Sequence, residues 1–407
     1  MAACASAVVI TRAGRSEVQQ RPTPACRRGE ALVAVAAVGV CATDVELFTG
    51  TMGYFEAGLS TWPMTPGHEW VGEIAALGAG CPSHLSVGQR VIGEHATGCQ
   101  PAPPEEEVLH LSKAFMQAKC AYCKLPGGFI GCPRRAETGF FRRDGAFQTQ
   151  MKYPAKQLHV IPSSVPWELA ALAEPLSTAH KAVRLARLEE LSVAQTDGEG
   201  PRVLVAGDGP VGLLVVQVLR WRGARVTCVV GTSPSRLSRA IELGAESVWN
   251  IAERGEEELC NSLESNGGLP ALAIEAAGHP SAVPLVLRAV KPGGRVVLLG
   301  LSGNLPCQVR QDDIVLKQLT IRGSLSSEPE DWRAVAKMLS HGAVKSVVTH
   351  TLEGLEKYEE AIKLVQRPPE GMLKLLLSPN PSRFALRAGN EDAASPVKRA
   401  RHAAQSC

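Results

Sequence analysis

The sequence has no apolar run that approaches the roughly 20 residues that a membrane-spanning helix needs. It also lacks a strong excess of one charge: the formal net charge is +3, whereas nucleic-acid-binding domains are usually far more basic. The first residues, "MAACASAVVITRAGRSEV", carry no basic region before their short apolar run, so no secretory signal is expected. These absences argue against a nucleic-acid binder and a membrane protein, and they leave a cytoplasmic protein as the expectation.

The chain has 407 residues, more than one ordinary hydrophobic core accommodates, so about two or three domains are expected. In a reducing compartment its 12 cysteines do not form a disulfide framework. Cysteines that lie close together therefore indicate metal binding or catalysis. The cysteines to consider are Cys41, Cys99, Cys120, Cys123 and Cys132.

The chain changes character near its middle. Up to about residue 164, short apolar runs are broken by Gly and Pro, which is typical of a β-barrel or sandwich. From residue 201, apolar strands alternate with amphipathic helices, which predicts a parallel sheet with helices on both faces. Residues 379–407 lack periodicity, so we expect a disordered tail, and we interpret its "VKRARH" as a solvated charge cluster rather than a nuclear-import patch.

A glycine-rich segment, "VLVAGDGPVGLLVVQVL", lies where a predicted strand meets a predicted helix. Gly207 permits a tight turn, Gly209 lets the backbone approach a pyrophosphate, and Gly212 allows close packing of helix on strand. The helix begins near Pro210 and Val211, so the phosphates would meet its positive end. Within a β-α-β run this spacing predicts a dinucleotide site.

The end of the next strand indicates which dinucleotide is preferred. An acidic residue is normally expected there to bind the ribose 2′-hydroxyl, but Gly231 stands in its place. Thr232 and Ser233 can donate hydrogen bonds to a 2′-phosphate, and Arg236 could pair with it. The sequence therefore favours NADP(H) over NAD(H).

Three short segments offer metal ligands. "GVCATDVELF" carries Cys41 with the hydroxyl of Thr43 nearby, "TPGHEW" carries His68 and Glu69, and "LAEPL" carries Glu174. Thiol, imidazole and carboxylate together suit Zn²⁺. Taken singly, each residue is equally well interpreted as a buried thiol, a surface His–Glu pair or a helix-start Glu.

The chain resembles the zinc-containing medium-chain dehydrogenases, on the polyol and threonine dehydrogenase branch. Matching segments appear in the family's order over about residues 30–378, among them "PGHEWVGEI", "AEPLS", "VAGDGPVGLL" and "LRAVKPGGRVVLLGL". The resemblance implies a GroES-like β-barrel catalytic domain over residues 1–178 and a Rossmann domain over residues 179–324. Residues 325–378 would return to the catalytic domain, and the catalytic site would lie between the two domains.

The same resemblance implies roles for individual residues. Cys41, His68 and Glu69 are the expected ligands of a catalytic zinc, and Glu174 matches a position that supplies a further ligand or holds a water on the metal. Thr43 matches the hydroxyl that begins a proton relay. The zinc would act as a Lewis acid on the substrate oxygen while hydride passes between the carbinol carbon and the nicotinamide.

The resemblance leaves the substrate open among alcohols, polyols and sugar-like molecules. Glu46 stands where threonine and sorbitol enzymes often carry His, so neither of those substrates is assigned. Tyr54, Phe55 and Trp62 are candidate substrate contacts, although they could equally serve as packing residues. Members of the branch form dimers and tetramers through the Rossmann sheet edge, which implies a homo-oligomer.

The remaining cysteines match the structural-zinc lobe of this family, expected here over residues 94–135. The family's spacing is C-x2-C-x2-C-x7-C, whereas here 20 residues separate Cys99 from Cys120 and eight separate Cys123 from Cys132. An insertion at about residues 100–118 is therefore predicted. A helix that returns its ends close together would keep all four thiols on one zinc; otherwise His95 or His110 would have to complete the set.

Two alternatives to a zinc-dependent dehydrogenase remain. A zinc-free quinone or enoyl reductase of the same superfamily would lack the set of thiol, imidazole and carboxylate residues that this sequence contains. A catalytically impaired binding protein, with the cysteine lobe acting as a zinc-ribbon-like module, is a different class of answer. The metal content of the protein distinguishes these possibilities.

Overall fold

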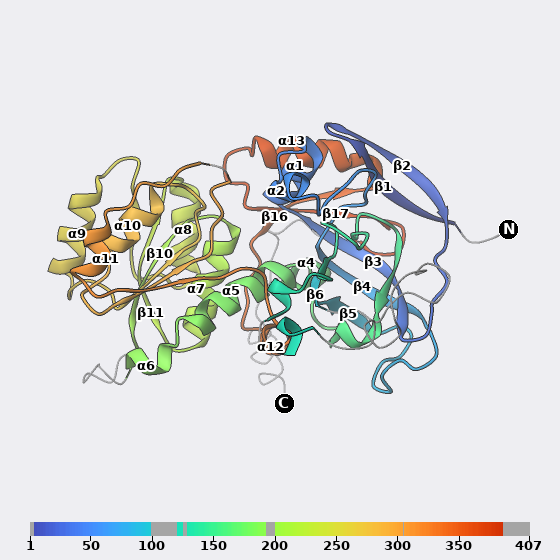
Figure 1. The fold of residues 1–407 in the computed structure, drawn as a ribbon, viewed down its shortest axis with the longest axis horizontal. Helices are drawn as coiled ribbons and strands as arrows, with labels where there is room; N and C mark the ends of the chain where they lie inside the picture. Colours follow the sequence, from blue (N-terminus) through green and yellow to red (C-terminus); the bar gives the residue numbers. More distant parts are fainter. Residues whose placement is uncertain (1–3, 99–119, 125–127, 193–199, 304, 386–407) are drawn as a thin grey trace, which may run out of the picture.

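The computed structural model describes residues 4–98, 120–124, 128–192, 200–303 and 305–385. It shows two domains side by side along the long axis of the molecule, one built around a mixed sheet and one around a parallel sheet (Figure 1). The predicted combination of a GroES-like barrel and a Rossmann domain is confirmed.

The first domain is built around a seven-stranded sheet. In bonding order its main path consists of β16 (Val348–Glu353), β17 (Lys374–Ser378), β3 (Glu30–Val40), β4 (Glu69–Leu77), β5 (Arg90–Gly93) and β9 (Leu158–Ile161), and β8 (Gln150–Pro154) also pairs with β3. Two small sheets accompany it: β1 (Cys4–Arg12) with β2 (Arg15–Pro22), and β6 (Ala96–Thr97) with β7 (Ala136–Glu137). Its short helices are α1 (Ala42–Thr49), α2 (Gly53–Glu56) and α4 (Trp167–Ala170).

After its first residue, Glu30, strand β3 is apolar because it is covered on both faces. Successive side chains of a strand point to opposite sides, and here they enter two different cores. Val33 and Val35 pack in the core of the barrel, whereas Ala34 and Ala36 join the core that continues into the other domain. The strand therefore lies between the barrel interior and the domain junction.

The second domain is a six-stranded parallel sheet. In bonding order its strands are β12 (Val248–Asn250), β11 (Arg225–Gly231), β10 (Arg202–Ala206), β13 (Leu272–Glu275), β14 (Arg295–Leu298) and β15 (Thr320–Gly323). Its helices are α5 (Ala173–Leu185), α6 (Leu188–Ser192), α7 (Pro210–Trp221), α8 (Pro234–Glu242), α9 (Glu256–Ser265), α10 (Ala282–Ala289) and α11 (Gln311–Val315). Val203 and Val205 face α5 and α7, while Leu204 and Ala206 face α9 and α10, as the predicted two-sided sheet requires.

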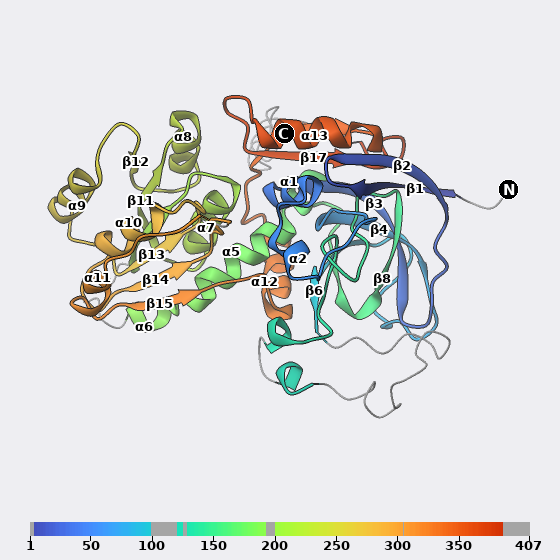
Figure 2. The same cartoon turned by 45° about the horizontal axis from the view of Figure 1, so that its top comes forward.

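One hydrophobic core crosses from domain to domain. It contains side chains of β3, α5, α7 and α12 (Pro329–Ser340), and Figure 2 shows α5 and α12 between the two sheets. The expected boundary between residues 178 and 179 falls inside α5, because this helix runs unbroken across the junction. After α12 the chain returns through β16, α13 (Tyr358–Gln366) and β17 to the seven-stranded sheet.

The segment after β17 differs from the expected disorder over its first residues. Asn380 donates hydrogen bonds from its side-chain amide to the carbonyls of Val35 and Thr149, at 2.7 and 2.8 Å. Phe384 is buried against Trp167. The expectation of disorder from residue 379 is therefore corrected for residues 379–385. The rest of the predicted tail, the predicted insertion at about 100–118 and Cys99 lie outside the described residues.

Among the described residues, every helix is too short or too polar to cross a bilayer.

A buried carboxylate joins α5 to α12. Asp331 accepts hydrogen bonds from His180 Nδ1 at 2.7 Å, from Arg184 Nε and Nη2 at 2.9 and 3.0 Å, and from the Glu328 backbone N–H at 2.9 Å. Removing such a carboxylate leaves its partners uncompensated away from water.

We predict that Asp331→Ala lowers the free energy of unfolding by about 3–5 kcal/mol, measured by urea denaturation. The matched control is Glu330→Ala in the same helix, because Glu330 also pairs with Arg184 but its side chain is 50% exposed. Its expected cost is below about 1 kcal/mol. Equal effects of the two substitutions would contradict the role given to Asp331.

Candidate active site

Cys41, His68 and Glu69 come together where β3 ends and β4 begins. Their ligand-type atoms all lie within 4.8 Å of one another. The two strands are antiparallel, and Gly39 of β3 stands opposite Glu69 of β4. Cys41 follows β3 directly, so the backbone pairing itself brings the thiol beside the carboxylate.

Two glycines provide the space for this group. A side chain at Gly39 would overlap the Glu69 carboxylate. Gly67, immediately before His68, has a φ of +102° and lies against the backbone and ring of Phe147. A glycine tolerates this conformation and this close approach, whereas a larger residue would displace His68.

A buried carboxylate faces the imidazole of His68. Asp44 Oδ2 accepts the Cys41 backbone N–H at 2.9 Å, and Asp44 Oδ1 lies 3.7 Å from His68 Nδ1. Burial by itself would lower the pKa of His68, but the Asp44 carboxylate raises it well above the ordinary value. With Nδ1 turned to Asp44, Nε2 is the nitrogen that faces Glu69, at 4.0 Å from Oε1.

Glu69 in turn has a buried cationic partner. Lys374 Nζ, from the start of β17, lies 2.6 Å from Glu69 Oε1 and 2.5 Å from Oε2. Burial opposes the charge on the ammonium, but Glu69 outweighs this and raises the pKa of Lys374. The carboxylate is thus held from the side of the returning chain.

The donor set fits a zinc ion. Asp44 Oδ1, His68 Nδ1 and Glu69 Oε2 are buried and make no hydrogen bond, although Glu69 Oε2 is within ion-pair distance of Lys374. Buried polar atoms usually have such partners, and a cation bound by neighbouring atoms satisfies this group electrostatically. One thiol, one imidazole and one carboxylate, with a carboxylate behind the imidazole, match the chemistry of zinc sites.

Glu174 lies beside this group rather than within it. It comes from the first turn of α5, accepts a hydrogen bond from the Thr178 hydroxyl at 3.4 Å and lies 3.7 Å from His95 Nδ1. Burial, reinforced by the charge of Glu69, raises the pKa of Glu174 to about 7. Of the four predicted ligands, three converge and the fourth stands next to them.

Polar residues continue away from Glu174. His95 Nε2 is 4.0 Å from Glu137 Oε2, and Arg135 Nε is 3.2 Å from the other oxygen of Glu137. The Ser326 hydroxyl lies 3.4 Å from His95 Nδ1. His95, which the sequence offered as a possible partner of the cysteine lobe, is therefore placed beside Glu174. Burial lowers the pKa of His95 well below its ordinary value.

The predicted substrate contacts separate into two groups. Tyr54 packs edge-on against Phe141, and burial together with the charge of Glu137 raises its pKa to about 12. Phe55 and Trp62 stack on each other with ring centroids 4.3 Å apart. These two rings pack at the margin of the barrel core, in accord with the packing alternative. Thr43 lies one residue inside α1, next to the cluster in sequence.

The glycine-rich turn has the geometry that its sequence predicts. Gly207 has a φ of +131°, and a side chain there would meet the backbone of Ala276 at 2.7 Å. A side chain at Gly212 would overlap the Gly207 carbonyl, whereas Gly209 faces open space. Pro210 begins α7, so the turn and the helix start are arranged as in a dinucleotide site.

The end of β11 holds a carboxylate that the sequence analysis did not place there. Asp208 Oδ2 accepts the backbone N–H groups of Thr232 and Ser233 at 2.9 and 2.8 Å. Arg236, expected to pair with a 2′-phosphate, donates from Nη2 to the Met372 carbonyl at 2.9 Å. The expectation that this strand end lacks a carboxylate is therefore corrected.

The cysteine lobe is described in part. The sulfur atoms of Cys120, Cys123 and Cys132 lie within 4.8 Å of one another, as ligands of one metal would. The fourth predicted ligand, Cys99, falls outside the described residues.

Comparisons with known proteins agree with this geometry. A family model described as the alcohol dehydrogenase GroES-like domain matches residues 27–163, and one described as zinc-binding dehydrogenase matches residues 210–341. An erythritol/L-threitol dehydrogenase of Mycolicibacterium smegmatis is 30% identical over 87% of this chain and 92% of its own length.

Solved structures show the same fold. A putative zinc-binding dehydrogenase from Sinorhizobium meliloti, bound to NADP, superposes with a TM-score of 0.78 at 25% identity, over 93% of this chain and all of its own. An alcohol dehydrogenase from Escherichia coli, complexed with NADH, gives 0.76 at 28% identity, over 92% and 99% of the two chains.

Several residues of the site escaped the sequence analysis. Lys374 left the clearest signal, since it is a single charge within the apolar run "MLKLLLS", and such a lysine requires a buried partner. The sequence already showed Asp44 near Cys41, at the spacing of a capping residue, but not its contact with His68. Glu137 and Ser326 left no comparable pattern.

We predict that Asp44→Asn weakens zinc binding by about 10- to 100-fold, because the amide still accepts the Cys41 N–H but no longer offers a charge to His68. Competition with a chromogenic chelator measures the affinity. Asp144→Asn, at an exposed carboxylate paired with Arg21, is the control and should leave the affinity unchanged. An Asp44→Asn protein with undiminished affinity would refute the orienting role.

Proposed function

Because this chain belongs to the zinc-binding alcohol dehydrogenase family, we propose that Cys41, His68 and Glu69 form the catalytic metal centre of an enzyme that acts on polyols or related alcohols. The protein is an oxidoreductase that transfers a hydride between a CH–OH group and NAD(P). The observation that carries the assignment of residues is the convergence of these three buried donors at the junction of β3 and β4.

Each residue of the centre has a separate task. A bound zinc ion would supply Lewis-acid polarisation of the substrate's C–O group. The Cys41 thiol, His68 Nε2 and a Glu69 oxygen would hold it, and Glu174, which lies beside this group, would join them or hold a water. Asp44 orients the imidazole, and Lys374 restrains Glu69.

Proton movement is assigned to α1. Thr43 and Glu46 are three residues apart on this helix, a spacing that places side chains on one face. Burial raises the pKa of Glu46, so its carboxyl group exchanges protons more readily near neutral pH. We assign the first transfer to the Thr43 hydroxyl and the next to Glu46 or a cofactor hydroxyl.

The polar residues beside Glu174 support a hydroxyl-rich substrate. His95, Glu137 and Ser326 are buried and offer donors and acceptors at the edge of the metal group. The hydroxyls of a polyol could exchange hydrogen bonds with these groups, whereas the chain of an aliphatic alcohol could not. The erythritol/L-threitol dehydrogenase relative acts on substrates of this polyol class.

The nicotinamide dinucleotide is assigned to the turn of Gly207, Gly209, Pro210, Val211 and Gly212. The sequence favours NADP(H) through Thr232, Ser233 and Arg236, but one solved neighbour holds NADP and another NADH. The contacts of Asp208 at the end of β11 also bear on the choice between the two dinucleotides.

We also assign a structural zinc to Cys120, Cys123 and Cys132, with Cys99 as the fourth ligand. A closed tetrahedral site of four thiolates would hold the lobe in shape without taking part in the reaction. The thiol-rich composition supports a cytoplasmic location, which we propose with it.

A homo-oligomer is proposed through the free edge of β15, which Figure 2 shows at the margin of the parallel sheet. All four residues of β15 are exposed. The exposed apolar residues in β15 and in the stretch of chain on either side of it are Leu301, Leu305, Val309, Val315, Leu316, Ile321 and Leu325. An open strand edge flanked by apolar surface is typical of a strand that pairs with a second copy.

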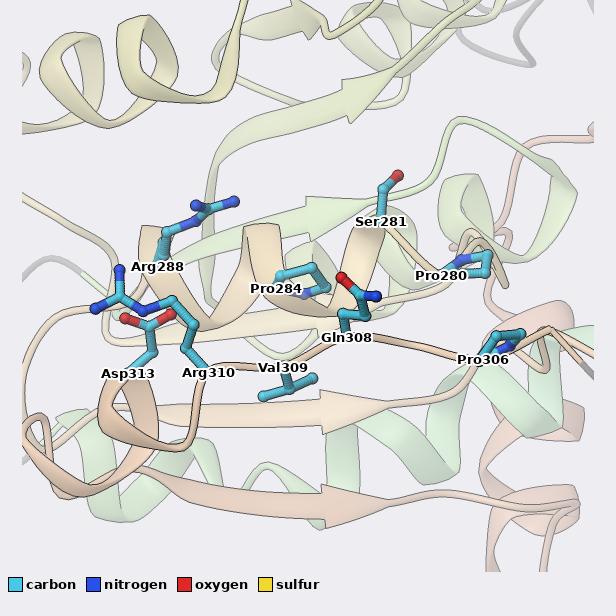
Figure 3. Close-up of a pocket in the computed structure, with 9 residues that line it drawn as sticks. All are labelled: Pro280, Ser281, Pro284, Arg288, Pro306, Gln308, Val309, Arg310 and Asp313. Carbon is cyan, nitrogen blue, oxygen red and sulfur yellow. The ribbon is translucent and has the colours of Figure 1, made fainter.

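A hollow of about 600 Å³ lies between α10 and the segment that enters α11. Figure 3 shows Arg288, Arg310 and Asp313 at one end of it and Pro280 and Pro306 at the other. Val309, one of the exposed apolar residues, forms part of its wall. We assign this hollow to the same interface, as space for side chains of the second copy.

The metal assignment predicts two zinc ions per chain, counted by elemental analysis. Cys120→Ser should lower the count to one and leave turnover of a polyol measurable. Cys41→Ala and His68→Ala should also lower it to one, and they should abolish turnover because the substrate then lacks its Lewis acid. Cys307→Ser, at an exposed thiol far from both groups in sequence, should keep two ions and full activity.

Turnover that persists in a Cys41→Ala protein that has lost its catalytic zinc would refute the mechanism. A single zinc in the unmodified protein would remove the structural site and retain the catalytic one.

The oligomer assignment predicts that the unmodified protein sediments as a dimer or tetramer, and that the pair Leu316→Lys and Ile321→Lys converts it to a single chain. Two lysines would place like charges across the symmetric contact. Val87→Lys is the control, because Val87 is also apolar and 62% exposed but lies in the catalytic domain. A single-chain mass for the unmodified protein at all concentrations would contradict the proposal.

A further inference from the structure

The carboxylate at the end of β11 comes from the glycine-rich turn instead of from the strand. We propose that Asp208 selects the cofactor: it takes the place of the missing strand-end acid, binds the adenosine ribose and disfavours a 2′-phosphate, so that NAD(H) is preferred over NADP(H). The proposal rests on the proposed function, since it concerns the dinucleotide site of that enzyme.

The Asp208 carboxylate lies where a strand-end acid would lie. A side chain built on Gly231 would overlap the Cβ, Cγ and Oδ2 atoms of Asp208. Asp208 therefore occupies the space into which an acid at position 231 would project. Gly231 and Asp208 act as a pair: the glycine leaves the space open and the aspartate fills it.

Backbone groups at the end of β11 hold the Asp208 carboxylate in place. Oδ2 accepts two backbone N–H groups, those of Thr232 and Ser233, at 2.9 and 2.8 Å. Ser233 is the residue that precedes α8, so the positive end of that helix also favours a negative group at this point. In the described part of the chain Oδ1 accepts no hydrogen bond, which leaves it for the hydroxyls of a ribose.

The groups that would bind a 2′-phosphate already have other partners. Backbone N–H groups at a helix start are the natural donors for it, but those of Thr232 and Ser233 already bind Asp208. Arg236 donates to the Met372 carbonyl at 2.9 Å and so connects α8 to the segment before β17. A 2′-phosphate would meet a like charge beside donors that are already engaged.

The simpler alternative is that Asp208 only braces the turn between β11 and α8. The Asp208→Asn substitution separates the two roles. Its amide oxygen still accepts both N–H groups, so the brace is kept, but the negative charge is lost. A purely structural Asp208 would leave the preference between the two dinucleotides unchanged in this variant.

The experiment titrates NADH and NADPH into the full-length protein by nucleotide fluorescence, without substrate. We expect the unmodified protein to bind NADH about tenfold more tightly than NADPH, or better, because like charges at close range cost at least that factor. In Asp208→Asn this ratio should fall by about tenfold with an unchanged melting temperature. Asp312→Asn, at an exposed carboxylate on α11, is the control and should retain the original ratio.

A second variant tests the exchange of position. Asp208→Gly combined with Gly231→Asp moves the acid from the turn back to the strand end, where the removal of the whole Asp208 side chain, including its Cβ, makes room for it. The double variant should recover the NADH preference that Asp208→Gly alone loses.

The outcomes separate the two proposals. If neither nucleotide binds, the proposed function fails and this inference with it. If both bind but NADPH binds as tightly as NADH, or the ratio is unchanged in Asp208→Asn, the inference alone is overturned.

Discussion

The site depends on the hydrogen-bonded edges of one strand, β3. Its last residues pair with β4 on one side and with β17 on the other, so that Gly39 stands opposite Glu69 and Val40 opposite Leu375. The thiol of Cys41 follows at the end of the strand. Two neighbouring strands and a third that lies about 300 residues further along the chain thus meet through backbone pairing, before any side chain contributes.

Charge then decides what this meeting point can hold. Two buried carboxylates, Asp44 and Glu69, lie near the thiol, and the nearby cationic groups are Lys374 and a His68 whose pKa is raised. Burying an uncompensated charge is costly, yet two of the carboxylate oxygens and an imidazole nitrogen have no hydrogen bond. A divalent cation held by the thiol, His68 Nε2 and Glu69 would balance the negative charge gathered here, with Asp44 behind the imidazole at Nδ1.

At the dinucleotide turn, two side-chain positions compete for one space. Gly231 and Asp208 come from different loops, yet each defines what the other can be, because both would occupy one volume at the end of β11. A sequence motif that considers only position 231 at the end of the strand contains no acid there, because the residue is glycine. The fold supplies the acid from 23 residues earlier in the sequence.

The sequence by itself determined the features that follow from local spacing. The alternation of strands and helices after residue 201, the turn of Gly207, Gly209 and Gly212 and the barrel-like first half all depend on neighbours along the chain, and the structure has each of them. The assignment of Cys41, His68 and Glu69 as zinc ligands came from the family resemblance, because isolated residues form no periodic pattern in the sequence.

Only the tertiary structure decided the contacts made across long separations. The pairing of Lys374 with Glu69, the placement of His95 beside Glu174 and the packing of residues 379–385 join segments whose spacing in the sequence contains no signal. Asp208 at the end of β11 belongs with them. The physical reason is that such contacts arise from which strands pair and which side chains share a volume, and neither is written in the order of neighbouring residues.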